Sequence, residues 1–205
     1  MKRVVSCAVL MLLAAAGCSR RDASSTAAEA VQDPTVGPAA GVASAEPTEV
    51  AMPADPAQAA RFEGYGDMKL GSSAAEARQA WGGDLQGSVS EPGACHYLFP
   101  AWAKGSGELG FMIEGDRFMR YDVGSGKETA PGGGKVGMTG DEIRALYGDA
   151  LQAGPHKYVE GAQYLSIAPG GEGTAKLVFE TDVRGSVTAW RVGLPPQVDY
   201  VEGCS

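Results

Sequence analysis

Aromatic residues are scarce in this chain: five Phe, three Trp and seven Tyr make up 7% of its 205 residues. Histidine is scarcer still, with two residues, His96 and His156. Neither has a cysteine or carboxylate at the spacing of a metal-ligand set, which argues against a metal centre. Because the aromatic side chains are so few, we expect them at packing or contact positions.

Positive charge is also in short supply, since 17 Lys and Arg face 25 Asp and Glu, for a formal net charge of −8. An acidic balance argues against nucleic acid as a partner, because such binding needs a basic surface. The chain contains no G-x-S-x-G nucleophile motif, and Gly132–Lys135 lacks the other residues of a phosphate-binding loop. We therefore expect no enzyme, and neither catalytic residues nor a cofactor.

The N-terminus has the pattern of an export signal. Lys2 and Arg3 precede an apolar run over residues 4–16, which is too short to span a bilayer. The small residues that end this run, just before Cys18, resemble a bacterial lipobox. The resemblance implies a signal peptide over residues 1–17 and acylation of Cys18, with palmitate among the chains. Ala15 stands where that motif usually has Leu, so cleavage without acylation is the alternative.

Residues 18–61 contain almost no large apolar side chain and are rich in Ala, Pro, Glu, Ser and Thr. A segment of this composition cannot bury enough surface to fold, and we expect a disordered tether that spans about 35 Å as a coil. A partly helical segment is the alternative. Ser19 follows Cys18, and by resemblance to lipoprotein sorting a residue other than Asp there implies the outer membrane.

The four cysteines divide into two groups. Cys7 lies in the signal peptide and Cys18 would carry lipid, which leaves Cys95 and Cys204 as a pair in an oxidising compartment. We predict a disulfide between them. It would close a loop of 109 residues (204 − 95) and stabilise the fold by about 4–5 kcal/mol. Two free thiols are the alternative.

One short stretch occurs twice in the chain in similar form, at residues 70–82 and 136–148. Gly71 and Gly137, like Glu76 and Glu142, are 66 positions apart (137 − 71 and 142 − 76). A constant offset indicates an internal repeat.

Both copies predict a helix with a capping box, formed by Ser73 with Glu76 and by Thr139 with Glu142. In each copy apolar residues follow at i, i+3 and i+4 spacing, which predicts one buried helix face. A glycine follows each stretch, and we expect a left-handed helix end at Gly82 and at Gly148.

Alternating apolar and polar residues predict three strands after each helix. The expected strands cover residues 95–99, 109–114, 117–123, 162–167, 175–180 and 186–192. The sequence thus predicts an α+β fold of two tandem helix-plus-three-stranded antiparallel repeats, which form one open sheet with the helices on one face. Repeat 1 covers residues 62–126, a linker covers 127–135, and repeat 2 covers 136–205.

Alternation also assigns side chains to the two faces of the sheet. The face toward the helices receives Met119, Tyr121, Val123, Trp190 and Val192. The open face receives Phe118, Arg120, Asp122 and Arg191. Arginine and aromatic residues are favoured at contact centres, so these four are the candidate partner-binding patch. An ordinary solvated sheet face is the alternative.

The stretch Val136–Ile143 resembles the opening of the repeat in the β-lactamase-inhibitor-protein fold. A single unit of this kind is similar to the small outer-membrane lipoprotein of the β-barrel assembly machinery. The resemblance covers about residues 62–205 and implies tandem α-β-β-β units. The inhibitor family places a disulfide within each unit, whereas the one predicted here joins the two. No contact residue of that family is therefore carried over.

Together these patterns predict a lipoprotein of the cell envelope, anchored in the outer membrane and facing the periplasm. We expect a non-catalytic module that binds an envelope protein, with inhibition as one form of that role. The alternatives are a structural or biogenesis factor of the envelope and a lectin-like protein that binds carbohydrate.

Overall fold

The computed structural model describes residues 59–88, 91–168 and 174–205. The predicted signal peptide, Cys18 and the tether up to residue 58 lie outside this part. Among the described residues, no helix has the length and apolar character needed to cross a membrane.

Helices α1 (Ala74–Trp81) and α2 (Gly140–Tyr147) begin as predicted. In α1, the Ser73 hydroxyl accepts from the Glu76 N–H at 3.2 Å, and the Glu76 carboxylate accepts from the Ser73 N–H at 2.8 Å. Thr139 and Glu142 form the same pair of bonds at the start of α2. Both capping boxes are therefore confirmed.

The two helices end differently. Gly82 adopts the predicted left-handed conformation, with φ 71° and ψ 5°. Gly148 has φ 54° but ψ −136°, so the left-handed end expected there is wrong. The chain instead continues into the 3₁₀ turn η1 (Gly148–Ala150) before the next strand.

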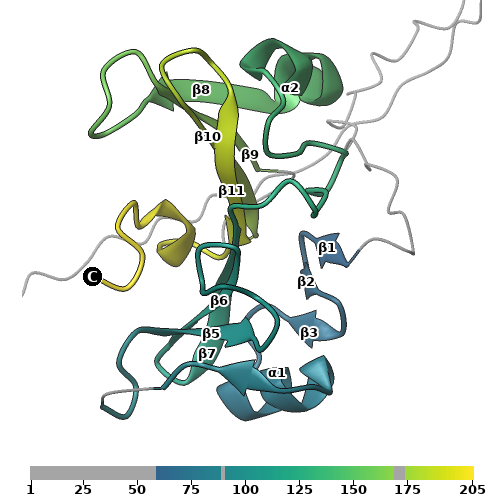
Figure 1. Cartoon of the computed structure of the whole chain (residues 1–205), viewed down its shortest axis with the longest axis vertical. Helices are drawn as coiled ribbons and strands as arrows, with labels where there is room; N and C mark the ends of the chain where they lie inside the picture. The colour runs from purple at the N-terminus through teal and green to yellow at the C-terminus, as the bar shows by residue number, and fades with distance from the viewer. Residues whose placement is uncertain (1–58, 89–90, 169–173) are drawn as a thin grey trace, which may run out of the picture. The chain divides into compact units, whose positions relative to one another are not determined.

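Two antiparallel sheets contain most of the regular structure (Figure 1). The large sheet has eight strands in the order β4-β5-β6-β7-β11-β10-β9-β8. Its strands are β4 (Leu85–Gln86), β5 (His96–Pro100), β6 (Leu109–Glu114), β7 (Arg117–Val123), β8 (Leu151–Pro155), β9 (Gln163–Ile167), β10 (Lys176–Thr181) and β11 (Val187–Gly193). The small sheet contains β1 (Ala60–Arg61), β2 (Gly64–Tyr65) and β3 (Met68–Lys69).

The predicted fold class is wrong, because the described chain is mostly β rather than two helix-plus-three-stranded repeats. Two helices of eight residues stand against eleven strands. The prediction missed β4, β8 and the whole small sheet, whose first strand includes residues assigned to the tether. These strands are short or poor in β-branched residues, so pairing with neighbours rather than local preference holds them in the sheet.

The core lies on one face of the large sheet. Both helices and the small sheet pack there, on the side opposite the C-terminus in Figure 1. Trp190 of β11 is 1% exposed, and its ring meets that of Tyr121 edge-on at 6.0 Å. An aromatic cluster of this kind supplies much of the buried apolar surface in a chain with few aromatic residues.

One predicted face assignment fails because of a bulge in β7. Met112 pairs with Arg120, but Ile113 pairs with Phe118, so Met119 is an extra residue in the ladder. An extra residue reverses the alternation beyond it. Phe118 is therefore fully buried in the core, while Met119, expected inside, is only half-buried.

The predicted linker over residues 127–135 is packed against the folded body. The Tyr147 hydroxyl donates to the Pro131 carbonyl at 2.6 Å and accepts from the Gly134 N–H at 3.1 Å. A Cβ atom on Gly134 would lie 2.4 Å from the Phe179 ring, so only glycine fits there. These contacts fix the position of the chain that leads into α2.

Candidate functional site

The centre of the other face of the large sheet carries two buried arginines. β7 and β11 are neighbours, with Arg191 paired to Asp122 and Gly193 to Arg120. These side chains alternate with Tyr121 and Trp190 along the strands and so project away from the core. Arg120 and Arg191 are nevertheless each only 4% exposed.

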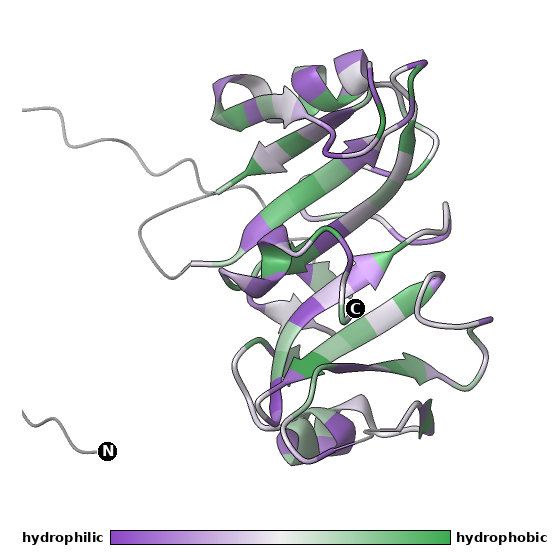
Figure 2. Ribbon diagram, turned by 90° about the vertical axis from the view of Figure 1, so that its left-hand side faces the viewer, coloured by the Kyte–Doolittle hydropathy of each residue, from purple (hydrophilic) through white to green (hydrophobic). Residues whose placement is uncertain are grey.

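Residues 194–205, called here the C-terminal segment, cover this part of the face. Figure 2 views the face with the segment running across it. The segment leaves β11 with a bond from the Leu194 N–H to the Met119 carbonyl at 2.9 Å, and then forms the 3₁₀ turn η2 (Gln197–Asp199). Val198 in this turn is completely buried.

Arg120 binds the main chain of the C-terminal segment. Its Nη1 donates to the carbonyls of Gln197 at 3.0 Å and Tyr200 at 2.6 Å, and its Nε donates to the Asp122 carboxylate at 2.9 Å. Burial acts to lower the pKa of Arg120, but nearby acidic groups, with Asp122 foremost, together outweigh it and raise the pKa. The guanidinium therefore stays charged under the segment.

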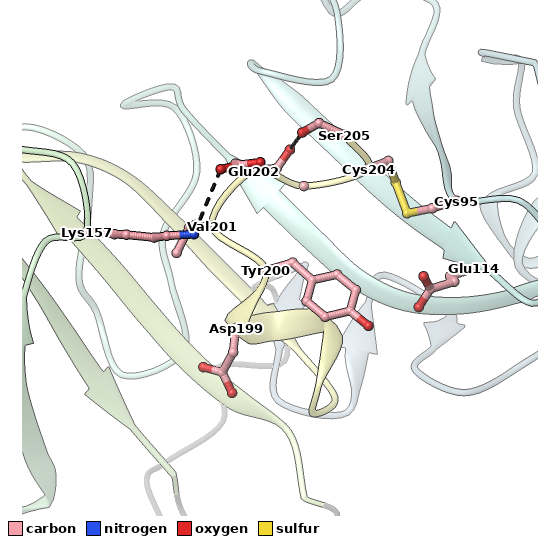
Figure 3. A pocket seen from close by; sticks show the side chains of 10 residues that line it. Cys95, Glu114, Lys157, Asp199, Tyr200, Val201, Glu202, Cys204 and Ser205 are labelled. Atoms are coloured by element: carbon pink, nitrogen blue, oxygen red, sulfur yellow. Dashed lines mark hydrogen bonds and ion pairs between the residues drawn. A yellow bond between two sulfur atoms is a disulfide. The ribbon is translucent and has the colours of Figure 1, made fainter.

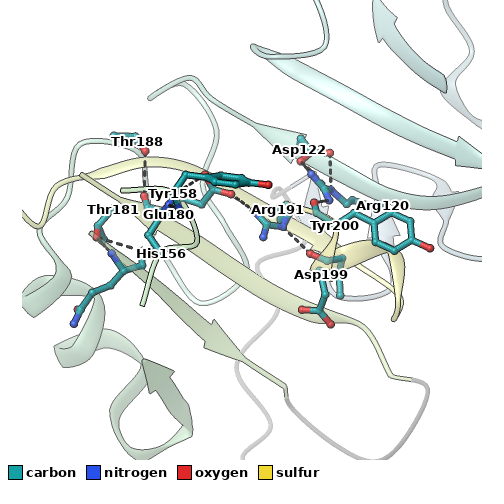
Figure 4. Close-up of polar contacts among 12 residues, drawn as sticks. Arg120, Asp122, His156, Tyr158, Glu180, Thr181, Thr188, Arg191, Asp199 and Tyr200 are labelled. Carbon is teal, nitrogen blue, oxygen red and sulfur yellow. Dashed lines mark hydrogen bonds and ion pairs between the residues drawn. The ribbon is translucent and has the colours of Figure 1, made fainter. Parts of the chain in front are cut away.

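Arg191 holds the same turn from the neighbouring strand. Its Nε donates to the Val198 carbonyl at 2.6 Å, and its other end pairs with Glu180 (Figure 4). The guanidinium carbon also lies 5.5 Å from the centre of the Tyr164 ring. Charge-assisted bonds from two buried arginines fix residues 197–200 against the sheet.

The exposure predicted for the patch Phe118, Arg120, Asp122 and Arg191 is wrong. Phe118 lies in the core because of the bulge, and both arginines lie beneath the C-terminal segment. Asp122 is half-buried and committed to Arg120. The three charged residues do lie together, but their bonds hold the chain's own C-terminal segment.

A disulfide ties the far end of that segment to the start of β5. Cys95 and Cys204 are joined as predicted, with Cα atoms 5.2 Å apart. The Gln197 side-chain amide donates to the Glu114 carboxylate at 2.6 Å, which adds a link to the end of β6. The segment is thus held at its start, its middle and its end.

A cleft of about 570 Å³ lies along the C-terminal segment (Figure 3). One wall includes the disulfide and Glu114, and the opposite side includes Lys157. Tyr200 and Glu202 of the segment also line it. Such a cleft has both apolar and charged groups within reach of a partner.

The loop between β8 and β9, residues 156–162, lies beside the cleft, and its Lys157 lines the cleft (Figure 3). The Tyr158 hydroxyl donates to the Glu202 carboxylate, and Lys157 Nζ is 3.9 Å from the same group. Tyr158 and Val159 remain 57% and 41% exposed. The loop is therefore attached to the C-terminal segment while it presents apolar surface to solvent.

His156 shapes this loop from within. Its Nδ1 accepts from the Tyr158 N–H at 3.1 Å and from the Val159 N–H at 3.2 Å. The imidazole stacks on the Tyr164 ring at 4.5 Å and has Nε2 3.8 Å from the Glu180 carboxylate. These contacts commit Nδ1 to the loop backbone and place Nε2 toward Glu180.

Arginine side chains, a disulfide and a cleft characterise this face. Within the described ranges, no three His, Cys, Asp or Glu side chains are grouped so that they could hold a metal ion. The sequence reading did not identify Tyr158 and Val159. Their signal was present as two apolar residues between Lys157 and Glu160, in a short stretch that the strand prediction left unassigned.

No family model, no curated protein and no solved structure matches this chain.

Proposed function

We propose that this chain is an exported, lipid-anchored protein of the cell envelope whose folded part binds another protein without catalysis. Its contact surface, called here the cleft surface, consists of Lys157, Tyr158, Val159, Tyr200 and Glu202. The opening of α2, which resembles that of an inhibitor family, favours the same class of role.

One observation carries the proposal: exposed apolar side chains are held in place beside a cleft. Tyr158 is bound to Glu202 through its hydroxyl, and its ring lies 4.9 Å from Lys157 Nζ. An aromatic anchor fixed before binding loses little conformational entropy on association. Exposed Tyr with charged neighbours at the rim is the pattern of a protein contact centre.

Placement in the envelope rests on two separate features. A disulfide such as Cys95–Cys204 persists in oxidising compartments outside the cytoplasm. Cys18 and the stretch before it predict an acylated N-terminus in the outer membrane, and residues 18–58 would let the folded part work at a distance from it.

Metabolic labelling tests the anchor directly. Cells that express the full chain are grown with an alkyne-bearing palmitate analogue, beside cells that express Cys18→Ala. We expect label on the wild-type chain and none on the variant. Equal labelling of both would remove the lipid anchor from the proposal.

Site-specific photo-cross-linking tests the binding role. A photoreactive amino acid replaces Tyr158 or Val159 in the full chain within intact cells, and Leu146 serves as the control. Leu146 is 45% exposed on α2, which packs on the core face of the sheet. We expect one discrete protein adduct from positions 158 and 159 but not from 146. No protein adduct, or the same adducts at all three positions, would contradict the proposal.

The exposed Tyr158 ring also favours carbohydrate binding as a second candidate, because sugar rings stack on aromatic faces. Lys157 and His156 both contact the Tyr158 ring, but the side chain is 57% exposed and so offers surface to a ligand. A glycan array probed with wild type and Tyr158→Ala separates the two candidates. Binding that is lost in the variant would support the lectin-like role, and an array without hits would exclude it.

A further inference from the structure

We propose that His156 makes the cleft surface pH-sensitive: its protonation releases the β8–β9 loop and weakens partner binding. The effect on binding rests on the proposed function, whereas the release of the loop does not.

At neutral pH the His156 ring must lack a proton on Nδ1. That nitrogen accepts from two backbone N–H groups, those of Tyr158 and Val159, at 3.1 and 3.2 Å. A ring nitrogen that accepts a hydrogen bond cannot carry a proton of its own. The proton therefore resides on Nε2, which faces Glu180 at 3.8 Å.

Protonation reverses the role of Nδ1 while it strengthens the other contacts. A protonated Nδ1 is a donor and faces two N–H donors, so both bonds to the loop are lost. The ring itself stays, because the positive charge improves its pairing with Glu180 and it remains stacked on Tyr164 at 4.5 Å. The part that moves is consequently residues 157–162, while the His156 ring stays in place.

The charged and titratable groups around the ring come from every neighbouring element, and Figure 4 shows Tyr158, Glu180 and Arg191 among them. They are Glu180 from β10, Arg191 from β11, Tyr164 from β9, Lys157 and Tyr158 from the loop, and Glu202 from the C-terminal segment. Glu180 lies 3.8 Å from His156 Nε2 and is also paired with Arg191, while Lys157 and Glu202 are paired with each other.

Loss of the two N–H bonds affects the residues that form the contact surface. The backbone of Tyr158 and Val159 is then no longer held in one position by hydrogen bonds to His156. The Tyr158 side chain is consequently less well placed for its hydrogen bond to Glu202. Histidine is the side chain that gains charge between about pH 8 and pH 5. We therefore expect a rigid cleft surface at neutral pH and a loosened one under mild acid.

Hydrogen exchange on the full chain in detergent micelles tests the mechanism without a partner. The readout is the protection of the peptide that spans residues 156–162, corrected for the intrinsic exchange rate, at about pH 7.5 and pH 5.5. We expect protection in wild type to fall about tenfold at the lower pH, as the loss of net hydrogen-bond energy implies. Equal protection at both pH values would overturn the proposal.

Three variants assign the effect to the imidazole. In His156→Asn, the side-chain Oδ1 takes the place of Nδ1 as an acceptor but does not titrate, so the loop should stay protected at both pH values. His156→Ala should leave it unprotected at both. His96→Asn removes the other histidine of the chain and should behave as wild type. The same pH response in wild type and His156→Asn would refute the mechanism, even if His156→Ala did not fold.

Binding to the cross-linked partner separates this proposal from the proposed function. If the loop opens in acid and affinity falls in wild type but not in His156→Asn, both stand. If the loop opens and affinity is unchanged, the pH mechanism holds and the assignment of the cleft surface fails. If the loop stays closed, the pH proposal fails alone.

Discussion

At the scale of single residues, burial separates side chains that look alike in the sequence. Trp190 is 1% exposed in the aromatic core, whereas Trp102 in the loop after β5 is 57% exposed. The hydrophobic effect scales with the apolar area removed from water. Only the first of these two tryptophans therefore stabilises the folded state to a large extent.

Replacement of Trp190 by Ala should lower the free energy of unfolding by about 3–5 kcal/mol, through lost burial and the cavity that remains. The same change at Trp102 should alter it by less than about 0.5 kcal/mol. Urea unfolding followed by circular dichroism measures both. Similar losses for the two variants would show that the assignment of the core is wrong.

The alternation of apolar and polar residues predicted much of the core correctly, but it also gave one of the main errors. Alternation correctly placed Tyr121, Trp190 and Val192 inside, because these positions keep the period of two. It placed Phe118 outside because it did not account for the bulge in β7. A bulge depends on how two strands pair, and the sequence of one strand does not determine that pairing. The sequence predicted that Arg120 and Arg191 lie on the same face, but it could not predict that both are buried.

At the scale of elements, the helix starts show how local chemistry sets structure. The hydrogen bond from the Ser73 hydroxyl lowers the pKa of Glu76, with a further contribution from the Ser73 N–H. The bond from the Thr139 N–H lowers the pKa of Glu142, helped by the Thr139 hydroxyl. Each carboxylate is thus favoured in its charged form when the helix is folded.

These two lowered pKa values predict a loss of stability in acid. A carboxylate whose pKa is lower in the folded state stabilises the fold above its ordinary range and loses that effect as pH falls through the folded value. Below about pH 4.5 the wild-type chain should weaken more steeply than Glu76→Gln/Glu142→Gln. Urea midpoints across this range measure the difference, with the exposed Glu160→Gln as the control. Parallel curves for the double variant and wild type would contradict the coupling.

The boundaries of elements were predictable only where the signal was local. Both capping boxes depend on residues three positions apart, so the sequence was sufficient for them. β8 has the sequence Leu-Gln-Ala-Gly-Pro and is held in the sheet through its pairing with β9. The C-terminal segment likewise has no periodic pattern. Its position depends on Arg120, which is 77 residues from Gln197, and on Arg191, which is 7 residues from Val198.

At the scale of the whole molecule, one disulfide closes a loop that contains most of the described residues. Cys95 and Cys204 enclose a separation of 109 residues and fasten the C-terminal segment across the sheet. A covalent link of this span mainly reduces the freedom of the unfolded chain. It also fixes one wall of the cleft.

Replacement of both cysteines, Cys95→Ser/Cys204→Ser, should lower the free energy of unfolding by up to about 4–5 kcal/mol. Hydrogen exchange should increase in residues 201–205, while residues 197–200 stay protected because Arg120 and Arg191 hold them. Urea unfolding and peptide-level exchange measure the two effects. Unchanged stability, or loss of protection across all of residues 194–205, would contradict this account of how the segment is held.

If a partner protein binds at the cleft surface, removal of its aromatic anchor must lower the affinity for the purified cross-linked partner. Tyr158→Ala should weaken binding about tenfold or more, as truncation of an aromatic anchor does. Val183→Ala, which alters a 63% exposed residue on the β10–β11 hairpin, should leave affinity unchanged. Equal affinities for wild type, Tyr158→Ala and Val183→Ala would contradict the claim.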